Sequence, residues 1–165
     1  MSYDPTTGLT QVAPRLYYGN LAAAHGARIM DAATVHACKE PCHKQALGYA
    51  KSLPNSHPHY LALERGKHLY LNMIDPPLPL FSLPLFAAFF AFADAHLPHR
   101  PLIIHCNQGL SRAPSLALLL MAKRLNLLTD ENYAAARAAF AAQHAYAPGQ
   151  GIATFLAANW DLLGR

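Results

Sequence analysis

A chain of 165 residues, of which 53% are hydrophobic and 13% charged, has the length and composition of one globular domain; both values exclude a disordered chain. The net charge of +4 comes from scattered Lys and Arg residues, which suits an anionic substrate and predicts no nucleic-acid partner. Three cysteines are too few for a disulfide scaffold, so we expect free thiols in a reducing compartment.

No segment of the sequence has the pattern of a secretory signal or a membrane span. Residues 1–10 lack a basic start followed by an apolar stretch. The longest apolar run, residues 78–93, contains prolines, stops at Asp94 and is shorter than the ~20 residues that a membrane helix needs. We therefore expect a soluble, cytoplasmic monomer without membrane insertion.

Hydrophobic periodicity and turn residues predict strands that alternate with helices in the first half of the chain. Residues 39–66, rich in proline and glycine, predict a partly helical insertion with a loop. The other predicted elements are a strand and turn at 12–20, a short helix at 21–33 interrupted near Gly26, a strand at 34–38, and a strand at 68–75 that ends before Pro76-Pro77.

The second half of the chain predicts one further strand among helices. These elements are a helix after the cap Ser82 with Pro84 in its first turn, a strand at 101–106, a helix at 115–125, a helix capped by Thr129, and a last helix at 151–160. Strands alternating with helices predict a single α/β domain, with a central, mostly parallel sheet flanked by helices. Its core spans about residues 12–160.

The stretch "PLIIHCNQGLSRAPSLALLL" (101–120) places a cysteine between a strand and a helix. The backbone N–H groups of such a loop and the start of the helix form a cradle for an anion. Gly109 allows backbone conformations closed to other residues, and Arg112 brings a planar fork that binds two phosphate oxygens. The predicted phosphate-binding loop consists of Asn107, Gln108, Gly109, Leu110, Ser111 and Arg112.

Cys106 lies at the base of this cradle, where the N–H groups and Arg112 favour the thiolate form. A thiolate that faces a bound phosphorus atom is a nucleophile for phosphoryl transfer. The hydroxyl of Ser111 is placed to hydrogen-bond the sulfur and help it leave. The ester oxygen also needs a proton, and Asp75, at the carboxyl end of a predicted strand, is the candidate general acid.

With these residues in place, the sequence resembles the cysteine-dependent protein tyrosine phosphatases, and most of all their small dual-specificity members. "HCNQGLSR" is similar to the signature of that superfamily, "NMIDPP" to its general-acid loop, and "PRLYYGNLAAA" and "YAPGQGIATFLAANW" to its first and last segments. The resemblance implies Cys106 as nucleophile, Arg112 as phosphate binder and Asp75 as acid. It also implies Ser111 as leaving-group helper, His105 as a support of the loop, and no metal or other cofactor.

Three features depart from the family, one of which is the unusual Asp75-Pro76-Pro77 sequence of the acid loop. Ala113 stands where the family usually has Ser or Thr, and residues 39–66, which help to shape the pocket rim, do not align. A separate pattern, His36, Cys38, Cys42 and His43, raises the alternative of a zinc site. Its Cys-x3-Cys spacing fits such a site only loosely, and residues without a joint role are the favoured interpretation.

The favoured hypothesis is a phosphatase that acts on phosphotyrosine or phosphoserine/threonine in a protein substrate. A phosphoinositide or an RNA 5′-phosphate is a second candidate substrate, although the variable loop positions Asn107, Gln108 and Leu110 carry no charge. Two further hypotheses are a non-catalytic phosphopeptide-binding module and a sulfur-transfer or arsenate-reducing enzyme. The intact nucleophile argues against the binding module, and Asp75 with the Ser-Arg ending argues against the sulfur-transfer or arsenate-reducing enzyme.

Overall fold

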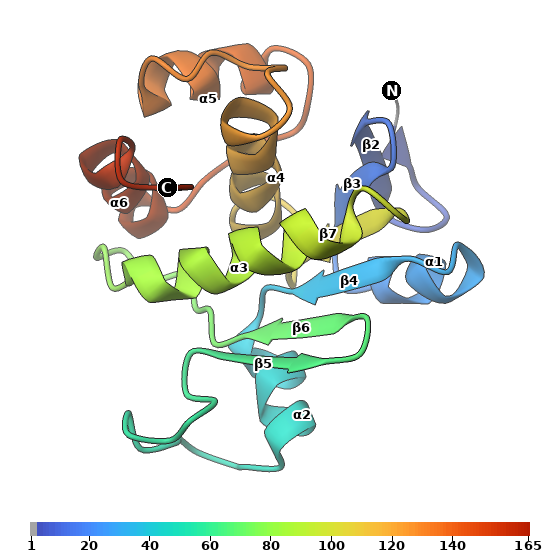
Figure 1. Cartoon of the computed structure of the whole chain (residues 1–165), viewed down its shortest axis with the longest axis vertical. Helices are drawn as coiled ribbons and strands as arrows, with labels where there is room; N and C mark the ends of the chain where they lie inside the picture. The colour runs from blue at the N-terminus through green and yellow to red at the C-terminus, as the bar shows by residue number, and fades with distance from the viewer. Residues whose placement is uncertain (1–2) are drawn as a thin grey trace.

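The computed structural model describes residues 3–165 and contains a seven-stranded sheet with helices on both faces (Figure 1). The strands are β1 (Tyr3–Asp4), β2 (Leu9–Ala13), β3 (Leu16–Gly19), β4 (Ala33–His36), β5 (Ala62–Arg65), β6 (His68–Leu71) and β7 (Leu102–His105). The helical segments are α1 (Ala23–Ile29), the turn η1 (Lys39–His43), α2 (Lys44–Leu47), α3 (Leu83–His96), α4 (Arg112–Lys123), α5 (Tyr133–Ala141) and α6 (Gln150–Asn159). This architecture confirms the predicted α/β class.

The sheet is mixed, with the order β1-β2-β3-β7-β4-β6-β5. The four central strands β3, β7, β4 and β6 are parallel, and the outer strands are antiparallel to their neighbours. β7 lies between two partners, so that Ile104 is opposite Tyr18 on β3 and opposite Val35 on β4. The carboxyl ends of the parallel strands therefore meet at one edge, where α/β proteins place their ligands.

The alternation of side chains along β7 distributes the core over the two faces of the sheet. Leu102 and Ile104 belong to the large core that α3, α4, α5 and α6 cover. Ile103 packs in a smaller cluster with Ala23 and Ala27 of α1. In Figure 1, α4, α5 and α6 lie together at the top of the view, and α2 lies at the opposite end, beyond β5. The fully apolar β7 is therefore covered on both faces, as its sequence predicts.

Two elements near the N-terminus differ from the sequence prediction. The predicted strand and turn at 12–20 covers the end of β2, the turn of a hairpin and β3. Arg15, with a φ of 66°, lies in the turn between the two strands. α1 is not interrupted at Gly26. A Cβ at this position would lie 2.9 Å from the Leu9 side chain, so the glycine permits close packing of the helix on the sheet.

The helix starts also differ in part from the prediction. α4 begins at Arg112, three residues before the predicted start at Ser115, so Arg112 itself is helical. The cap of α5 is Asn132, whose Oδ1 accepts a hydrogen bond from the Ala135 N–H at 2.8 Å. Thr129 instead accepts from the backbone N–H of Glu131 in the preceding turn. Both Thr and Asn suit a cap, and the sequence does not show which of two nearby candidates begins the helix.

The 39–66 segment joins β4 to β6 and adds β5, which pairs antiparallel with β6. Its first residue is tied to the segment that follows β6, because the Lys39 N–H donates to the Met73 carbonyl oxygen at 2.8 Å. The partly helical character predicted for this segment agrees with η1 and α2. Across residues 3–165, no helix combines the length and the apolar character that crossing a membrane requires.

Candidate active site

The loop from Cys106 to Arg112 connects the central strand β7 to the first turn of α4. The Cys106 N–H donates to the Gly19 carbonyl oxygen at 3.2 Å, and the Cys106 Sγ accepts from the Ala113 N–H at 3.4 Å. The cysteine is 2% exposed. Its sulfur therefore faces the first turn of α4, where the Ala113 N–H points at it.

Successive backbone N–H groups of this loop are left without an acceptor in the protein. Within the described chain, the N–H groups of residues 107–111 donate no hydrogen bond to another backbone or side-chain group. Gly109 makes this conformation possible with a φ of 73°. A Cβ there would also lie 2.7 Å from the Gly19 carbonyl carbon, so the loop needs glycine for two reasons. Such a run of free N–H groups is an anion-binding arrangement.

Arg112 is held in place by two hydrogen bonds from its guanidinium group. Its Nη1 donates to the Met73 carbonyl oxygen at 2.9 Å, and its Nη2 donates to Asn107 Oδ1 at 2.8 Å. Asn107 in turn donates through Nδ2 to the Glu40 carbonyl oxygen at 2.8 Å. The Arg112 Nε is buried and has no partner in the described chain. An oxyanion in the cavity would supply an acceptor for this donor.

Ser111 connects the loop to the segment before α6. Its Oγ accepts a hydrogen bond from the Gly149 N–H at 2.8 Å, and the Ala147 N–H donates to the Leu110 carbonyl oxygen at the same distance. Ser111 occupies the cap position of α4 but makes no side-chain capping hydrogen bond. Because its oxygen already accepts a hydrogen bond, its own proton is available to another group.

Asp75 reaches the site from a loop and not from a strand end. β6 ends at Leu71, so the predicted strand at 68–75 is shorter than expected. The Asp75 carboxylate lies against Gly149, where a Cβ would overlap its oxygens. The backbone of the next residues lies against Gly151, where a Cβ would meet the carbonyl oxygens of Pro76 and Leu78. Two glycines at the start of α6 thus let the Asp75 loop pack against the helix.

These residues line one cavity of about 390 Å³. Its lining consists of Asp75, Cys106, Asn107, Gln108, Leu110, Ser111, Arg112, Ala147 and Gly149. The structure therefore brings together the predicted nucleophile, arginine, acid and serine from two separate loops. Sequence reasoning missed Met73 and Gly149, which act through backbone groups that no side-chain motif reveals.

His105 supports the loop from the opposite side of β7, within a chain of three imidazoles. Its Nδ1 lies 3.4 Å from the Cys106 carbonyl oxygen, and its Nε2 lies 2.6 Å from His36 Nδ1. His36 Nε2 lies 3.0 Å from His68 Nδ1. A carbonyl only accepts, so His105 donates through Nδ1; His36 then donates to His105, and His68 donates to His36. Sequence reasoning identified His105 but missed its two partners on β4 and β6.

Burial keeps the inner imidazoles neutral. It lowers the pKa of His105 to about 4, and the charge of Arg112 acts in the same direction. Burial also lowers the pKa of His36 to about 3, with further contributions from His105 and His68. Both side chains are therefore uncharged at neutral pH.

Of the four residues considered for zinc, His36, Cys38 and Cys42 lie together, and His43 does not join them. Cys38 and Cys42 form a disulfide, and their Cα atoms lie 5.6 Å apart. The expectation that all thiols stay free is therefore wrong for these two, because the turn η1 brings the second cysteine back to the first. His43 points elsewhere, with Nδ1 2.7 Å from the Tyr49 hydroxyl and Nε2 3.0 Å from the His59 carbonyl oxygen.

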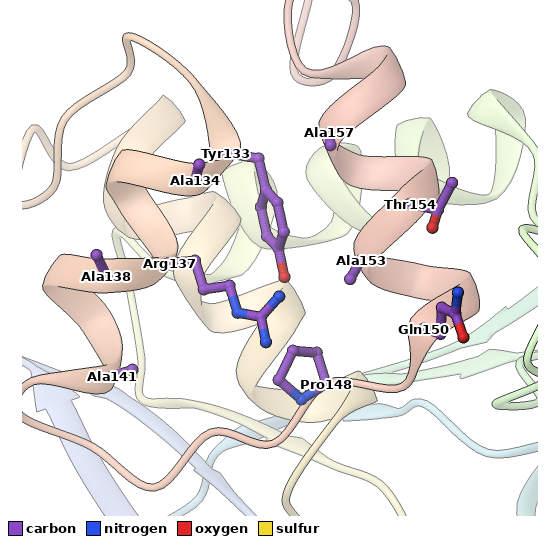
Figure 2. Close-up of a pocket in the computed structure, with 10 residues that line it drawn as sticks. All are labelled: Tyr133, Ala134, Arg137, Ala138, Ala141, Pro148, Gln150, Ala153, Thr154 and Ala157. Carbon is purple, nitrogen blue, oxygen red and sulfur yellow. The ribbon is translucent and has the colours of Figure 1, made fainter.

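A larger cavity of about 740 Å³ lies between α5 and α6 (Figure 2). Alanines from both helices form much of its lining, and Arg137 extends between Tyr133 and Pro148. It contains neither a nucleophile nor a carboxylate from the predicted set. The predicted catalytic residues therefore line the smaller cavity around Cys106 and not this one.

Solved structures that are similar to this chain include phosphatases and a phosphatase-like protein. Cydia pomonella PTP-2 phosphatase shares 20% identity and a TM-score of 0.63, with 93% of this chain and 90% of that chain covered. Human DUSP28 shares 16% identity and a TM-score of 0.61, with 98% of both chains covered. The chain has the dual-specificity phosphatase fold.

This phosphatase fold also includes the human tyrosine phosphatase-like serine/threonine/tyrosine-interacting protein. It shares 17% identity and a TM-score of 0.65 with this chain, covering 93% of this chain and 96% of that one. No family model matches the sequence, and no curated protein matches it either. The likeness therefore establishes the fold, and the activity must be argued from the side chains of the site.

Proposed function

We propose that this protein is a phosphatase that hydrolyses phosphomonoesters on proteins through a phosphocysteine intermediate. The observation that carries the proposal is that Cys106, Arg112 and Asp75 line a single cavity, above a loop with free N–H groups. A nucleophile, an anion-binding cradle and a proton donor are what cysteine-dependent phosphoryl transfer requires.

In the first step, the Cys106 thiolate attacks the phosphorus atom. A sulfur–phosphorus bond forms while the bond from phosphorus to the ester oxygen breaks, and Asp75 gives its proton to the departing oxygen. The loop N–H groups and the Arg112 guanidinium, whose Nε has no other partner, stabilise the charge on the three equatorial oxygens.

In the second step, water hydrolyses the phosphocysteine. The Asp75 carboxylate takes a proton from the water as its oxygen attacks phosphorus, and the sulfur–phosphorus bond breaks to give inorganic phosphate and the thiolate. Ser111 assists because its oxygen already accepts from Gly149, which leaves its proton to stabilise the departing sulfur.

The lining of the cavity favours a protein substrate that carries a single phosphate. Arg112 is the cation in the lining, and the variable loop positions Asn107, Gln108 and Leu110 are uncharged. Leu110 is 40% exposed at this cavity and can pack against an aromatic or aliphatic side chain. A polyphosphorylated lipid headgroup or an RNA end would gain few ion pairs here.

The nucleophile is tested by Cys106→Ser. We expect this variant to lose turnover of an aryl phosphate while it still binds inorganic phosphate, because the loop N–H groups and Arg112 remain. Rates are measured by phosphate release and binding by calorimetry. An active Cys106→Ser protein would contradict the mechanism. A wild-type protein that binds phosphate without turnover would leave the phosphate-binding module as the better description.

The general acid is tested by Asp75→Asn, with Asp94→Asn as the matched control. Asp94 lies on α3 and pairs with Arg124, away from the cavity. We expect Asp75→Asn to reduce kcat about 10²-fold or more and to remove the limb of the pH profile that reports the acid. Asp94→Asn should keep the wild-type kcat and the wild-type pH profile. An unchanged pH profile in Asp75→Asn would point to another proton donor.

The substrate class is tested by comparing rates on four substrates, with Cys106→Ser as the blank. The panel consists of a phosphotyrosine peptide, a phosphothreonine peptide, a phosphoinositide and an RNA 5′-phosphate. We expect a peptide to give the highest kcat/KM. Faster hydrolysis of the phosphoinositide or the RNA end would overturn the protein substrate and retain the chemistry.

A further inference from the structure

A buried cluster of metal-binding side chains lies next to the loop but outside its cavity. His36, Cys42 and His105 each place one ligand atom within 4.8 Å of the others, and all three are buried. None of them lines the substrate cavity. We propose that these three residues, with Cys38, form a Zn²⁺ site when the Cys38–Cys42 disulfide is reduced.

The chemistry of the cluster suits zinc. Imidazole nitrogen and thiolate sulfur are the ligands of structural zinc sites, which are closed and tetrahedral. The facing nitrogens of His36 and His105 are 2.6 Å apart. Zinc–nitrogen bonds of about 2.0–2.1 Å separate two tetrahedral nitrogen ligands by roughly 3.3–3.4 Å. Side-chain movements of about 1 Å therefore convert the hydrogen-bonded pair into a pair of ligands.

Both histidines already have the outer contacts that zinc ligands usually have. A ligating imidazole normally donates its other N–H to a carbonyl or a similar acceptor. His105 directs Nδ1 at the Cys106 carbonyl oxygen, which leaves Nε2 with a lone pair facing the cluster. His36 directs Nε2 at His68 Nδ1. When the proton of His36 moves from Nδ1 to Nε2 and the proton of His68 moves from Nδ1 to Nε2, the inner nitrogen of His36 is free to bind zinc and His36 donates to His68.

The disulfide decides whether the site has its sulfur ligands. In the oxidised protein the sulfurs of Cys38 and Cys42 are bonded to each other. A dithiol reductant delivers two electrons and two protons, becomes a disulfide itself, and leaves two thiols. Zinc then displaces both thiol protons and binds the two thiolates. Cys38 is the fourth ligand because its sulfur starts at bonding distance from that of Cys42.

The position of His105 links this site to the catalytic loop. His105 precedes Cys106 and contacts its carbonyl oxygen, so zinc on the other nitrogen fixes the ring orientation and strengthens that contact. Reduction or oxidation of Cys38 and Cys42 would in this way change how firmly the backbone of Cys106 is held, through contacts on the face of β7 opposite to the cavity.

The test uses Co²⁺ as a spectroscopic probe in the full-length Cys106→Ser protein, so that the nucleophile cannot bind the metal. A water-soluble phosphine reduces the disulfide and leaves as phosphine oxide. We expect the reduced protein to show a thiolate-to-cobalt charge-transfer band and tetrahedral visible bands, both of which Zn²⁺ abolishes by displacement. The same chain kept oxidised should show neither.

Variants locate the ligands. Cys42→Ser, which nearly preserves side-chain size, should lose most of the charge-transfer band, and His36→Asn should lose the tetrahedral spectrum. His99→Asn, at an exposed histidine outside the cluster, should bind as the parent does. Circular dichroism of each metal-free variant shows that the fold is kept. A reduced parent without the band, or an unchanged band in Cys42→Ser, would overturn the proposal. The readout requires no phosphatase activity, so it is independent of the function proposed above.

Discussion

Lowering the pH from 7 to 5 should destabilise the folded protein, because His36 and His105 are buried as neutral imidazoles. The pKa of His105 is lowered from 6.5 to about 4. Near pH 5 the unfolded chain therefore holds a proton on this residue that the folded chain lacks. Stability from this group is complete above the unfolded pKa and is lost as the pH falls toward the folded pKa.

Linkage at pH 5 gives about 2 kcal/mol of lost stability for His105 alone. His36, with its pKa lowered to about 3, adds a contribution of the same sign. The two rings face each other, so the pair as a whole contributes about 2–4 kcal/mol. Typical stabilities of 5–15 kcal/mol make a loss of this size easy to measure.

The assay is urea unfolding at both pH values in the presence of a chelator, followed by the fluorescence of Trp160. This is the single tryptophan of the sequence, and it is 3% exposed in the folded protein. His105→Asn should lose about 2 kcal/mol less between pH 7 and 5 than the wild type. His99→Asn, at an exposed position, should lose as much as the wild type.

The comparison of variants isolates His105 from other histidines that act in the same direction. Burial also lowers the pKa of His43, His68, His96 and His144. A His105→Asn protein that keeps the full wild-type pH difference would refute the reasoning. A wild-type protein that is equally stable at both pH values would refute it as well.

Two glycine substitutions test contacts of the site. Gly149→Ala should displace the Asp75 carboxylate. We expect kcat to fall by ~10²-fold for substrates with poor leaving groups and by less for an activated aryl phosphate, because only the poor leaving groups need the proton. Equal losses for the two kinds of substrate would contradict this role of Gly149. Gly109→Ala should cost about 1–2 kcal/mol for its positive φ and a further ~1–3 kcal/mol for overlap with Gly19, measured by urea unfolding. Gly48→Ala shares the positive φ but has open space around its Cβ, so an equal cost in both variants would exclude the overlap.

The phosphate-binding loop could be predicted from the sequence because its determinants are local. An apolar strand, a glycine at a fixed place and an arginine at the start of a helix all lie between residues 101 and 123. The structure places Gly109 at a positive φ and Arg112 at the start of α4. Such local signals do not depend on which strands are neighbours in the sheet.

The imidazole chain could not be predicted, because it depends on parallel pairing between strands far apart in the sequence. His36 is opposite His105 because β4 pairs with β7, and His68 joins them because β6 pairs with β4. The zinc hypothesis chose His43 as a partner from sequence proximity. The sheet instead supplies His105, which is distant in sequence and close in space.

The disulfide was missed because composition describes a whole chain and not a particular turn. Three cysteines argue against a disulfide scaffold, yet the turn η1 places Cys38 and Cys42 at a suitable Cα separation of 5.6 Å. The sequence predicted that Asp75 lies near the nucleophile, and Asp75 lines the same cavity as Cys106. The sequence did not predict that Asp75 lies on a loop beyond the strand, because the loop packs its backbone carbonyl groups against Gly151, which is distant in the sequence.

Because β7 lies at the centre of the sheet, the geometry of the site persists until the fold as a whole opens. Hydrogen bonds to β3 on one side and β4 on the other hold this strand, and the loop begins where it ends. Exchange of the β7 amide hydrogens therefore requires an opening that disrupts both neighbours, which is close to global unfolding. We expect these amides to be among the slowest to exchange, and we expect the geometry around Cys106 to persist through local openings elsewhere in the chain.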